Sequence, residues 1–376
     1  MSTTMSLQVE RVRNEREIEQ FIRFGWEVYQ GNPLWVPPNV SETRNFLAGK
    51  GLFFEHCRHA LFVAKENSKI VATAAAFYDN NLVAHWDKKV GLIGYFEALP
   101  DKFEAVQALF AKLESYLKSE GAEIIRTPVN GSIANPAGLL LNSFNETPVF
   151  LMMYNPSYYR QYFRRLSYEP IKDLLAFTVD LLDGRLRRKS QFILKRAQNS
   201  EVRTRPFDRK RFEEESDLLA RIYSETFKAH WGYAPQSEEE FYEILSPFKL
   251  ALESDFIQFA EHEGKVVGFA LGVPDYNPTF RRLNGNFDFL NVMSFLYLKR
   301  KIREGRLIAI GVVPEWRGKR IAPLLLASVF NAMMERGYIK CEYSWVFREN
   351  VSSQNVVRKF YSSDYKHYCV FEKKIA

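Results

Sequence analysis

The sequence has few cysteines and no long apolar run. Its three cysteines, Cys57, Cys341 and Cys369, are isolated, and neither they nor the six histidines follow a metal-ligand or disulfide spacing. No stretch approaches the roughly 18 consecutive apolar residues of a membrane span. The first residues lack the basic start and apolar run of a signal peptide. We therefore expect a cytoplasmic protein with reduced thiols and no metal site.

The length and the distribution of charge indicate two domains. A chain of 376 residues fits two compact cores of about 150 to 200 residues each. Residues 185–211 contain eleven Lys or Arg and two acids, which suggests a basic connector between domains at 1–184 and 212–376. A second basic group consists of Lys299, Arg300, Lys301, Arg303 and Arg306.

The basic segments are open to several interpretations. They are either solvated surface or they attract an anionic cofactor, an acyl carrier protein or an anionic membrane surface. Nucleic acid is not the expected partner, because no recognised nucleic-acid module accompanies the charge. The sequence does not indicate an oligomeric state.

Two parts of the chain repeat one pattern. Residues 60–78 and 256–273 each read as strand, polar turn, strand. A further strand and a helix follow each hairpin, at 90–99 and 102–119 in the first half and at 306–313 and 320–336 in the second. Gly121 and Gly337 stand where each helix should end. The repeat predicts a duplicated unit of the α/β class with mixed sheets.

One stretch, residues 308–322, carries recognisable chemistry. It reads as a strand, a turn with Pro314, and then Arg317-Gly-Lys-Arg320 at the start of a helix. Unpaired N–H groups and the positive end of the helix dipole make such a terminus a site for pyrophosphate. The basic side chains add charge-assisted contacts. This stretch therefore predicts a phosphate site.

The stretch resembles the acyl-CoA loop of GNAT N-acyltransferases, and landmarks along most of the chain resemble a bacterial family of tandem GNAT-like proteins. These landmarks include Asn32–Pro38, Gly94–Glu97, Met152–Tyr159 and Trp231–Tyr233. Arg320 departs from the family pattern, which has Gly there; a helical φ would still allow its N–H to bind. The first half has no such loop. The resemblance implies an acyl-CoA or acetyl-CoA site at Ile310, Val312, Val313, Arg317, Gly318, Lys319, Arg320, Ile321, Ala322 and Asn350.

The resemblance also implies direct attack of a primary amine on the thioester. A backbone N–H of Val312 or Val313 would stabilise the oxyanion, and a base would deprotonate the amine. The candidate bases are Asp275, Glu342 and Glu349, each of which also fits a structural role. Many members of the family use a Tyr to protonate the leaving thiolate. Val357 stands at that position in this sequence, so the candidate general acid is the nearby Tyr361.

Four functions remain open at this point. The first is acyl transfer from acyl-CoA to a small amine. The second is transfer of a long chain to a lipid-like amine at the inner face of a membrane, and the third is a GNAT-fold binding module without catalysis. The fourth is Fem-type aminoacyl transfer from a charged tRNA.

Overall fold

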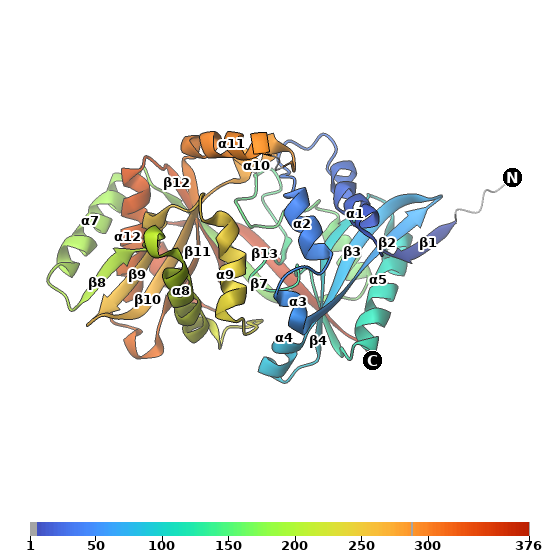
Figure 1. Ribbon diagram of the computed structural model, residues 1–376, viewed down its shortest axis with the longest axis horizontal. Coiled ribbons are helices and arrows are strands. Elements are labelled where there is room, and N and C mark those ends of the chain that lie inside the picture. Colours follow the sequence, from blue (N-terminus) through green and yellow to red (C-terminus); the bar gives the residue numbers. More distant parts are fainter. Residues whose placement is uncertain (1–5, 287–288, 376) are drawn as a thin grey trace.

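The computed structural model describes residues 6–286 and 289–375. A 13-stranded mixed sheet runs through both halves of this described chain, in the order β1-β2-β3-β4-β5-β13-β7-β12-β11-β10-β9-β8, with β6 paired to β13 (Figure 1). Helices cover both faces of the sheet. The architecture confirms the expected mixed α/β class.

The first half contains the elements from β1 to β7. In chain order they are β1 (Leu7–Arg11), α1 (Glu15–Val28), α2 (Val40–Leu47), α3 (Phe53–His56), β2 (Cys57–Glu66), β3 (Lys69–Asp79), α4 (Asn80–Trp86), β4 (Val90–Ala98), α5 (Phe103–Ser119), β5 (Ile124–Thr127), β6 (Leu139–Leu140), α6 (Tyr159–Arg165) and β7 (Glu169–Asp180).

The second half repeats this order with α7 added at its start, without a counterpart of β6, and with a longer helical insertion. Its elements are α7 (Gly184–Ala197), β8 (Val202–Pro206), α8 (Phe212–Phe227), α9 (Glu238–Leu245), β9 (Ile257–His262), β10 (Lys265–Pro274), α10 (Asn277–Leu283), α11 (Phe289–Leu298), β11 (Glu304–Val312), α12 (Ile321–Glu335), β12 (Lys340–Phe347), α13 (Val351–Arg358) and β13 (Ser363–Lys374). This insertion is α10 and α11, between β10 and β11, where the first half has α4 alone.

The repeated hairpins and helices lie where the sequence predicts them. The hairpins are β2–β3 and β9–β10, and the long helices are α5 and α12. Gly121 and Gly337 have φ of 104° and 77°, the left-handed backbone that favours glycine after a helix. Local turn and capping chemistry therefore predicts these elements well.

The two halves exchange their last strands. β7, from the first half, pairs with β12 of the second, while β13 pairs with β5 of the first. β7 and β13 also pair with each other, so the C-terminus lies in the first half (Figure 1). The exchange makes one continuous sheet out of two repeated units.

Residues 185–211, expected as a basic connector, are built into the second half. They form most of α7, which packs on α12, and β8, which pairs with β9. Several of their charges are neutralised locally, since Arg205 pairs with Glu215 and Glu261. Arg306, expected in the second basic group, is instead buried and donates to Ser344.

Candidate functional site

Strands β11 and β12 separate part-way along their length. They pair in parallel from Glu304 with Lys340 to Leu307 with Tyr343, and no further. On its other edge β11 stays paired with β10 as far as Val312. The edge of β11 from Ile308 onward is therefore open toward β12, and it leads into the loop before α12.

The start of α12 presents unpaired N–H groups. A 3₁₀ turn, Pro314–Trp316, follows β11, and α12 begins at Ile321 after four exposed residues, Arg317 to Arg320. Among the described residues, the N–H groups of Arg320, Ile321 and Ala322 have no backbone acceptor. Pro323 contributes no donor. Free donors, the helix dipole and three basic side chains together suit a pyrophosphate.

Two loop residues have left-handed backbone. Gly318 has φ of 80° and open space where a Cβ would stand. Arg320, the N-cap of α12, has φ of 63° and ψ of 18°. The sequence analysis considered a right-handed helical φ as the way for Arg320 to offer its N–H. The structure has a left-handed φ instead, so this position keeps the backbone that glycine favours.

The comparison with known families addresses this same region. Residues 217–361 match the model of the acetyltransferase (GNAT) family. These residues form a GNAT acetyltransferase domain. They include the open edge of β11, the loop, and α12.

Relatives extend the similarity over the whole chain. The chain is 28% identical over 368 residues to Protein YghO of Escherichia coli (strain K12), covering 96% of this chain and 94% of that protein. It is 26% identical over 384 residues to Bacterial ceramide synthase of Caulobacter vibrioides, covering 100% and 99%. A solved tandem GNAT protein from the clavulanic acid biosynthesis pathway has a TM-score of 0.60 at 9% identity, with 98% of each chain covered. The fold is therefore a tandem GNAT fold.

Within the GNAT domain, one of the two candidate oxyanion donors is already occupied. The Val313 N–H donates to Val267 O at 3.1 Å. Because donors alternate along a strand, the N–H groups of Val312 and Ile310 point toward the open edge. The Val312 carbonyl on that side accepts Nε of Arg317 at 3.2 Å. Val312 therefore remains a candidate donor and Val313 does not.

Asp275 and Glu342 are buried, and both contact other groups in the interior of the protein. Asp275 accepts the N–H groups of Phe150 at 2.8 Å and Asn277 at 3.1 Å, and burial raises its pKa to about 7. Glu342 is 1% exposed and lies 3.5 Å from Nζ of Lys366, and its Oε1 has no partner among the described residues. Both carboxyls lie near the start of β11, away from the loop at its end.

The other sequence candidates lie on the surface around α13. Glu349 pairs with Lys172. Asn350 caps α13 by accepting the Ser353 N–H at 3.1 Å. Tyr361 is 44% exposed, and the Arg185 guanidinium lies 4.8 Å from its ring centre. In these contacts Asn350 caps a helix, and Glu349 and Tyr361 pair with basic side chains on the surface.

The structure adds His230, which the sequence offered only as one of the scattered histidines. Its ring lies 4.5 Å from that of Phe227 and 6.3 Å from that of Phe347 on β12. Burial, and next the positive charge of Arg317, lower its pKa, so the imidazole is neutral at pH 7. No side chain among the described residues hydrogen-bonds it. No residue spacing in the sequence distinguishes His230 from the other histidines.

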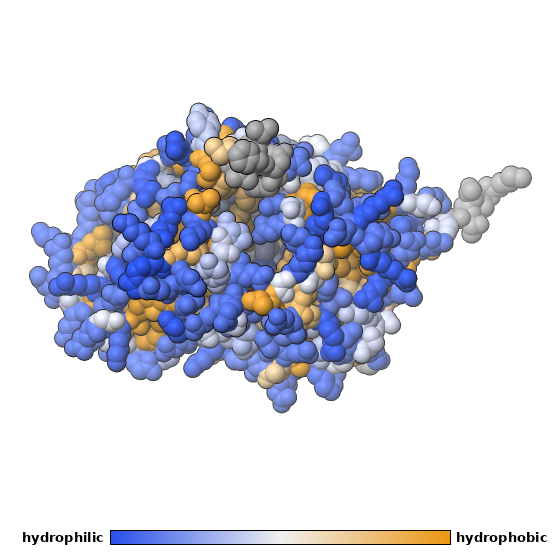
Figure 2. Space-filling model, viewed as in Figure 1, coloured by the Kyte–Doolittle hydropathy of each residue, from blue (hydrophilic) through white to orange (hydrophobic). Residues whose placement is uncertain are grey.

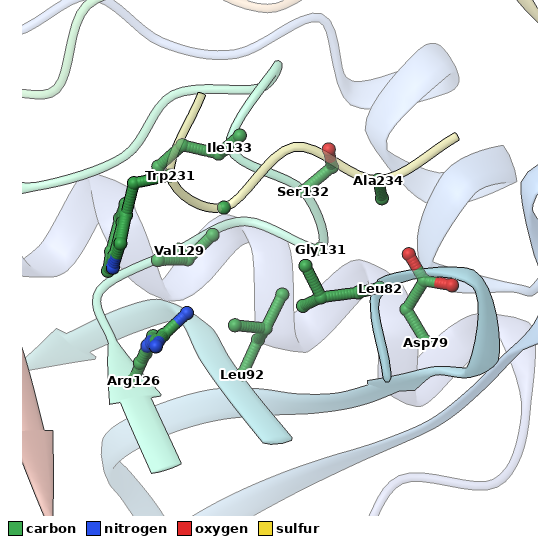
Figure 3. Close-up of a pocket in the computed structure, with 11 residues that line it drawn as sticks. Asp79, Leu82, Leu92, Arg126, Val129, Gly131, Ser132, Ile133, Trp231 and Ala234 are labelled. Atoms are coloured by element: carbon green, nitrogen blue, oxygen red, sulfur yellow. The ribbon is translucent and has the colours of Figure 1, made fainter. Parts of the chain in front are cut away.

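Next to His230, the segment 231–234 of the second half packs against the first half. Trp231 lies over Arg126 of β5, with the guanidinium 4.5 Å from the ring centre (Figure 3). Trp86 of α4 donates Nε1 to Tyr233 O at 2.7 Å. The cavity left here is about 10 Å³, room for about one water. Trp231 and Tyr233, which belong to one of the landmark segments of the sequence, therefore pack between the two halves.

The first half blocks its own equivalent of the open strand edge. β4 and β5 also pair only at their start, from Val90 to Leu92. Beyond it, the Val129 N–H donates to Ile93 O at 2.9 Å, and Asn130 Oδ1 accepts the Tyr95 N–H at 2.7 Å. A Cβ on Gly94 would stand 2.3 Å from Val129 O. The loop after β5 thus occupies the edge that the second half leaves open.

Proposed function

We propose that this protein transfers an acyl group from acyl-CoA to a primary amine. The observation that carries the proposal is the open edge of β11 leading directly into the unpaired N–H groups of α12. In this proposal, the donor for the thioester carbonyl and the N–H groups that bind the pyrophosphate belong to consecutive parts of one segment. The division into an N-terminal half without a CoA loop and a C-terminal half with one belongs to the same proposal.

The residues around the open edge suggest how the step proceeds. The amine nitrogen attacks the thioester carbon, the C–N bond forms, and the C–S bond breaks. The Val312 N–H donates to the oxyanion that develops. Neutral His230 takes the proton that the amine loses, and this proton passes to the departing thiolate, so that CoA leaves as the free thiol. Asp275 and Glu342 maintain the fold in this scheme.

We infer that the acceptor is a lipid-like amine and that the acyl chain is long. Support comes from the relative named a ceramide synthase, which aligns over both chains almost completely. The exposed end of the α10–α11 insertion fits a membrane surface: Met293 and Tyr297 are 54% and 60% exposed, and Arg300 and Lys301 follow them. Among the described residues, no helix combines the length and apolar character needed to cross a membrane.

The test is a calorimetric and thermal-shift titration with CoA, acetyl-CoA and palmitoyl-CoA. A ligand at a hundred times its Kd should stabilise the protein by about 2.7 kcal/mol. Gly318→Asp should abolish the shift by repelling the pyrophosphate. Gly31→Asp is the matched control, because Gly31 also has positive φ, 74°, and open space at its Cβ, but lies in the other half.

Turnover is measured separately, by mass spectrometry of the amide formed from palmitoyl-CoA and a long-chain primary amine. Amide formation that His230→Gln slows without weakening CoA binding supports the scheme. CoA binding without any amide formation would indicate a binding module. Failure to bind any of the three thiols or thioesters, together with binding of tRNA, would favour the Fem-type alternative.

Membrane association is tested by sedimentation with vesicles. Anionic vesicles should retain the protein and neutral ones should not. Reversing the charge of Arg300 and Lys301 to Glu should release it, whereas the same change at Lys88 and Lys112 in the first half should not. Equal retention of both variants would contradict the assignment.

A further inference from the structure

A cavity lined mainly by the N-terminal half is not used by the proposed reaction. Its volume is about 320 Å³, within the range of small-molecule sites, about 300 to 1,000 Å³. It lies between the halves, where α2, α10 and the chain after α9 meet (Figure 1), and this face is hollowed there (Figure 2). The lining is mostly aromatic and aliphatic, including Trp35, Phe96, Phe150 and Phe280.

This cavity is remote from the acyl-CoA loop. Strand pairing through β5, β13, β7 and β12 contains three antiparallel steps, so β4 and β11 run in opposite directions. The cavity therefore adjoins the end of β4 and the start of β11, near Asn277. The acyl-CoA loop follows the other end of β11, a nine-residue strand about 25 Å long.

Two polar side chains face the cavity from adjacent strands. Thr73 of β3 and Glu97 of β4 are directly opposite in the register, so both lie on one face of the sheet. Thr73 is fully buried, and its Oγ1 has no hydrogen-bond partner among the described residues. Glu97 accepts Tyr29 OH at 3.1 Å and Tyr159 OH at 2.7 Å. Glu97 stays partly accessible, although protein surrounds it, because it faces the cavity.

The lining has acids and no base. Glu42 and Glu97 both contribute to it, and no Lys, Arg or His is among its residues. Burial raises the pKa of both carboxyls, that of Glu97 to about 8. Buried carboxylates are normally paired with a cation, and aromatic rings such as Trp35 also attract one. The lining offers no positive charge that would stabilise the ionised form of either carboxyl, and a cationic ligand would supply one.

We propose that this cavity is a second binding site, for an amine that carries an apolar chain, with the amino group at Glu97 and Thr73. The chain lies against the Pro-rich segment 33–38, whose Trp35 ring stacks on Tyr29 at 4.9 Å. The first half thereby keeps a ligand site after its CoA edge is filled. The site is independent of acyl transfer in the other half.

The test compares three probes with the same chain, dodecylamine, dodecanol and dodecanoate, by calorimetry on the full chain below their micellar concentrations. Wild type should bind the amine at least tenfold more tightly than the alcohol, and the carboxylate least. Glu97→Gln should weaken amine binding at least tenfold and leave alcohol binding unchanged. Glu114→Gln is the matched control, because Glu114 also accepts a Tyr hydroxyl, that of Tyr168 at 3.1 Å, outside the cavity.

Further outcomes separate this site from the proposed reaction. Gly318→Asp should bind dodecylamine as wild type does, and palmitoyl-CoA should not compete with the amine. Equal affinity for the three probes, unchanged amine affinity in Glu97→Gln, or competition by palmitoyl-CoA would each overturn the proposal. Amine binding in a protein that fails to bind any acyl-CoA would leave this site standing and refute the acyl-transfer proposal alone.

Discussion

Glu97 should make the stability of the protein fall as the pH rises. Burial raises its pKa in the folded protein to about 8 from an ordinary value of 4.5. Between these values the folded protein holds a proton that the unfolded chain has released, so rising pH favours unfolding. The contribution of Glu97 to the free energy of unfolding is fully present below pH 4.5 and is lost by pH 8. At about 1.4 kcal/mol per pH unit, the step from pH 5.5 to pH 8 corresponds to about 3 kcal/mol.

The substitution Glu97→Gln isolates this contribution. Gln keeps an oxygen acceptor for the Tyr hydroxyls but does not titrate. Urea unfolding at pH 5.5 and pH 8 should show the variant gaining about 3 kcal/mol on wild type over this interval. The pH dependence from Asp275 is common to both proteins and cancels. Parallel curves for wild type and Glu97→Gln would refute the reasoning, because Glu97 would then ionise as it does in water.

Three other substitutions test particular backbone and hydrogen-bond claims. Arg320→Gly should raise the free energy of unfolding by about 0.5 to 1 kcal/mol, since φ of 63° is unfavourable for Arg; a loss in urea unfolding would contradict the left-handed assignment. Gly94→Ala should destabilise by about 2 to 3 kcal/mol, because its Cβ would meet Val129 O at 2.3 Å, while Gly184→Ala at the start of α7 should be close to neutral. Asp275→Asn should retain acyl transfer, because its oxygen can still accept the Phe150 N–H; a total loss of turnover with normal unfolding would restore Asp275 as a catalytic candidate.

Local sequence signals predicted the repeated elements and the order of strand, turn and helix in residues 308–322. Alternating strands, the turn at Glu263-Gly264 and the glycines after α5 and α12 act through nearby residues, so their positions can be inferred from the sequence. Arg320 shows a limit: a loop position can require glycine-like backbone even where the chain supplies another residue. The sequence marks the departure but not the φ that results.

Contacts between distant segments could not be predicted in the same way. The opposition of Thr73 and Glu97 depends on strand register, and the position of His230 depends on how segment 228–236 packs against the first half. The exchange of β7 and β13 leaves no local signal either, because each strand has a similar apolar pattern whichever partner it meets. Long-range pairing of this kind decides which candidate residues lie close together. It also decides that the Val313 N–H pairs with Val267 O while the Val312 N–H stays free to act as a donor.

The strand exchange also predicts how the chain can be divided. A fragment 185–376, which begins within α7, lacks β7 and leaves β12 and β13 without the strand between them. Exposed strand edges promote aggregation, so we expect this fragment to be insoluble. A fragment 167–376 restores β7 and should be soluble, leaving only the outer edge of β13 without its partners β5 and β6. Size-exclusion chromatography and CoA titration of both fragments check this. A soluble 185–376 fragment that binds CoA would show that each half folds on its own strands and that the exchange is dispensable.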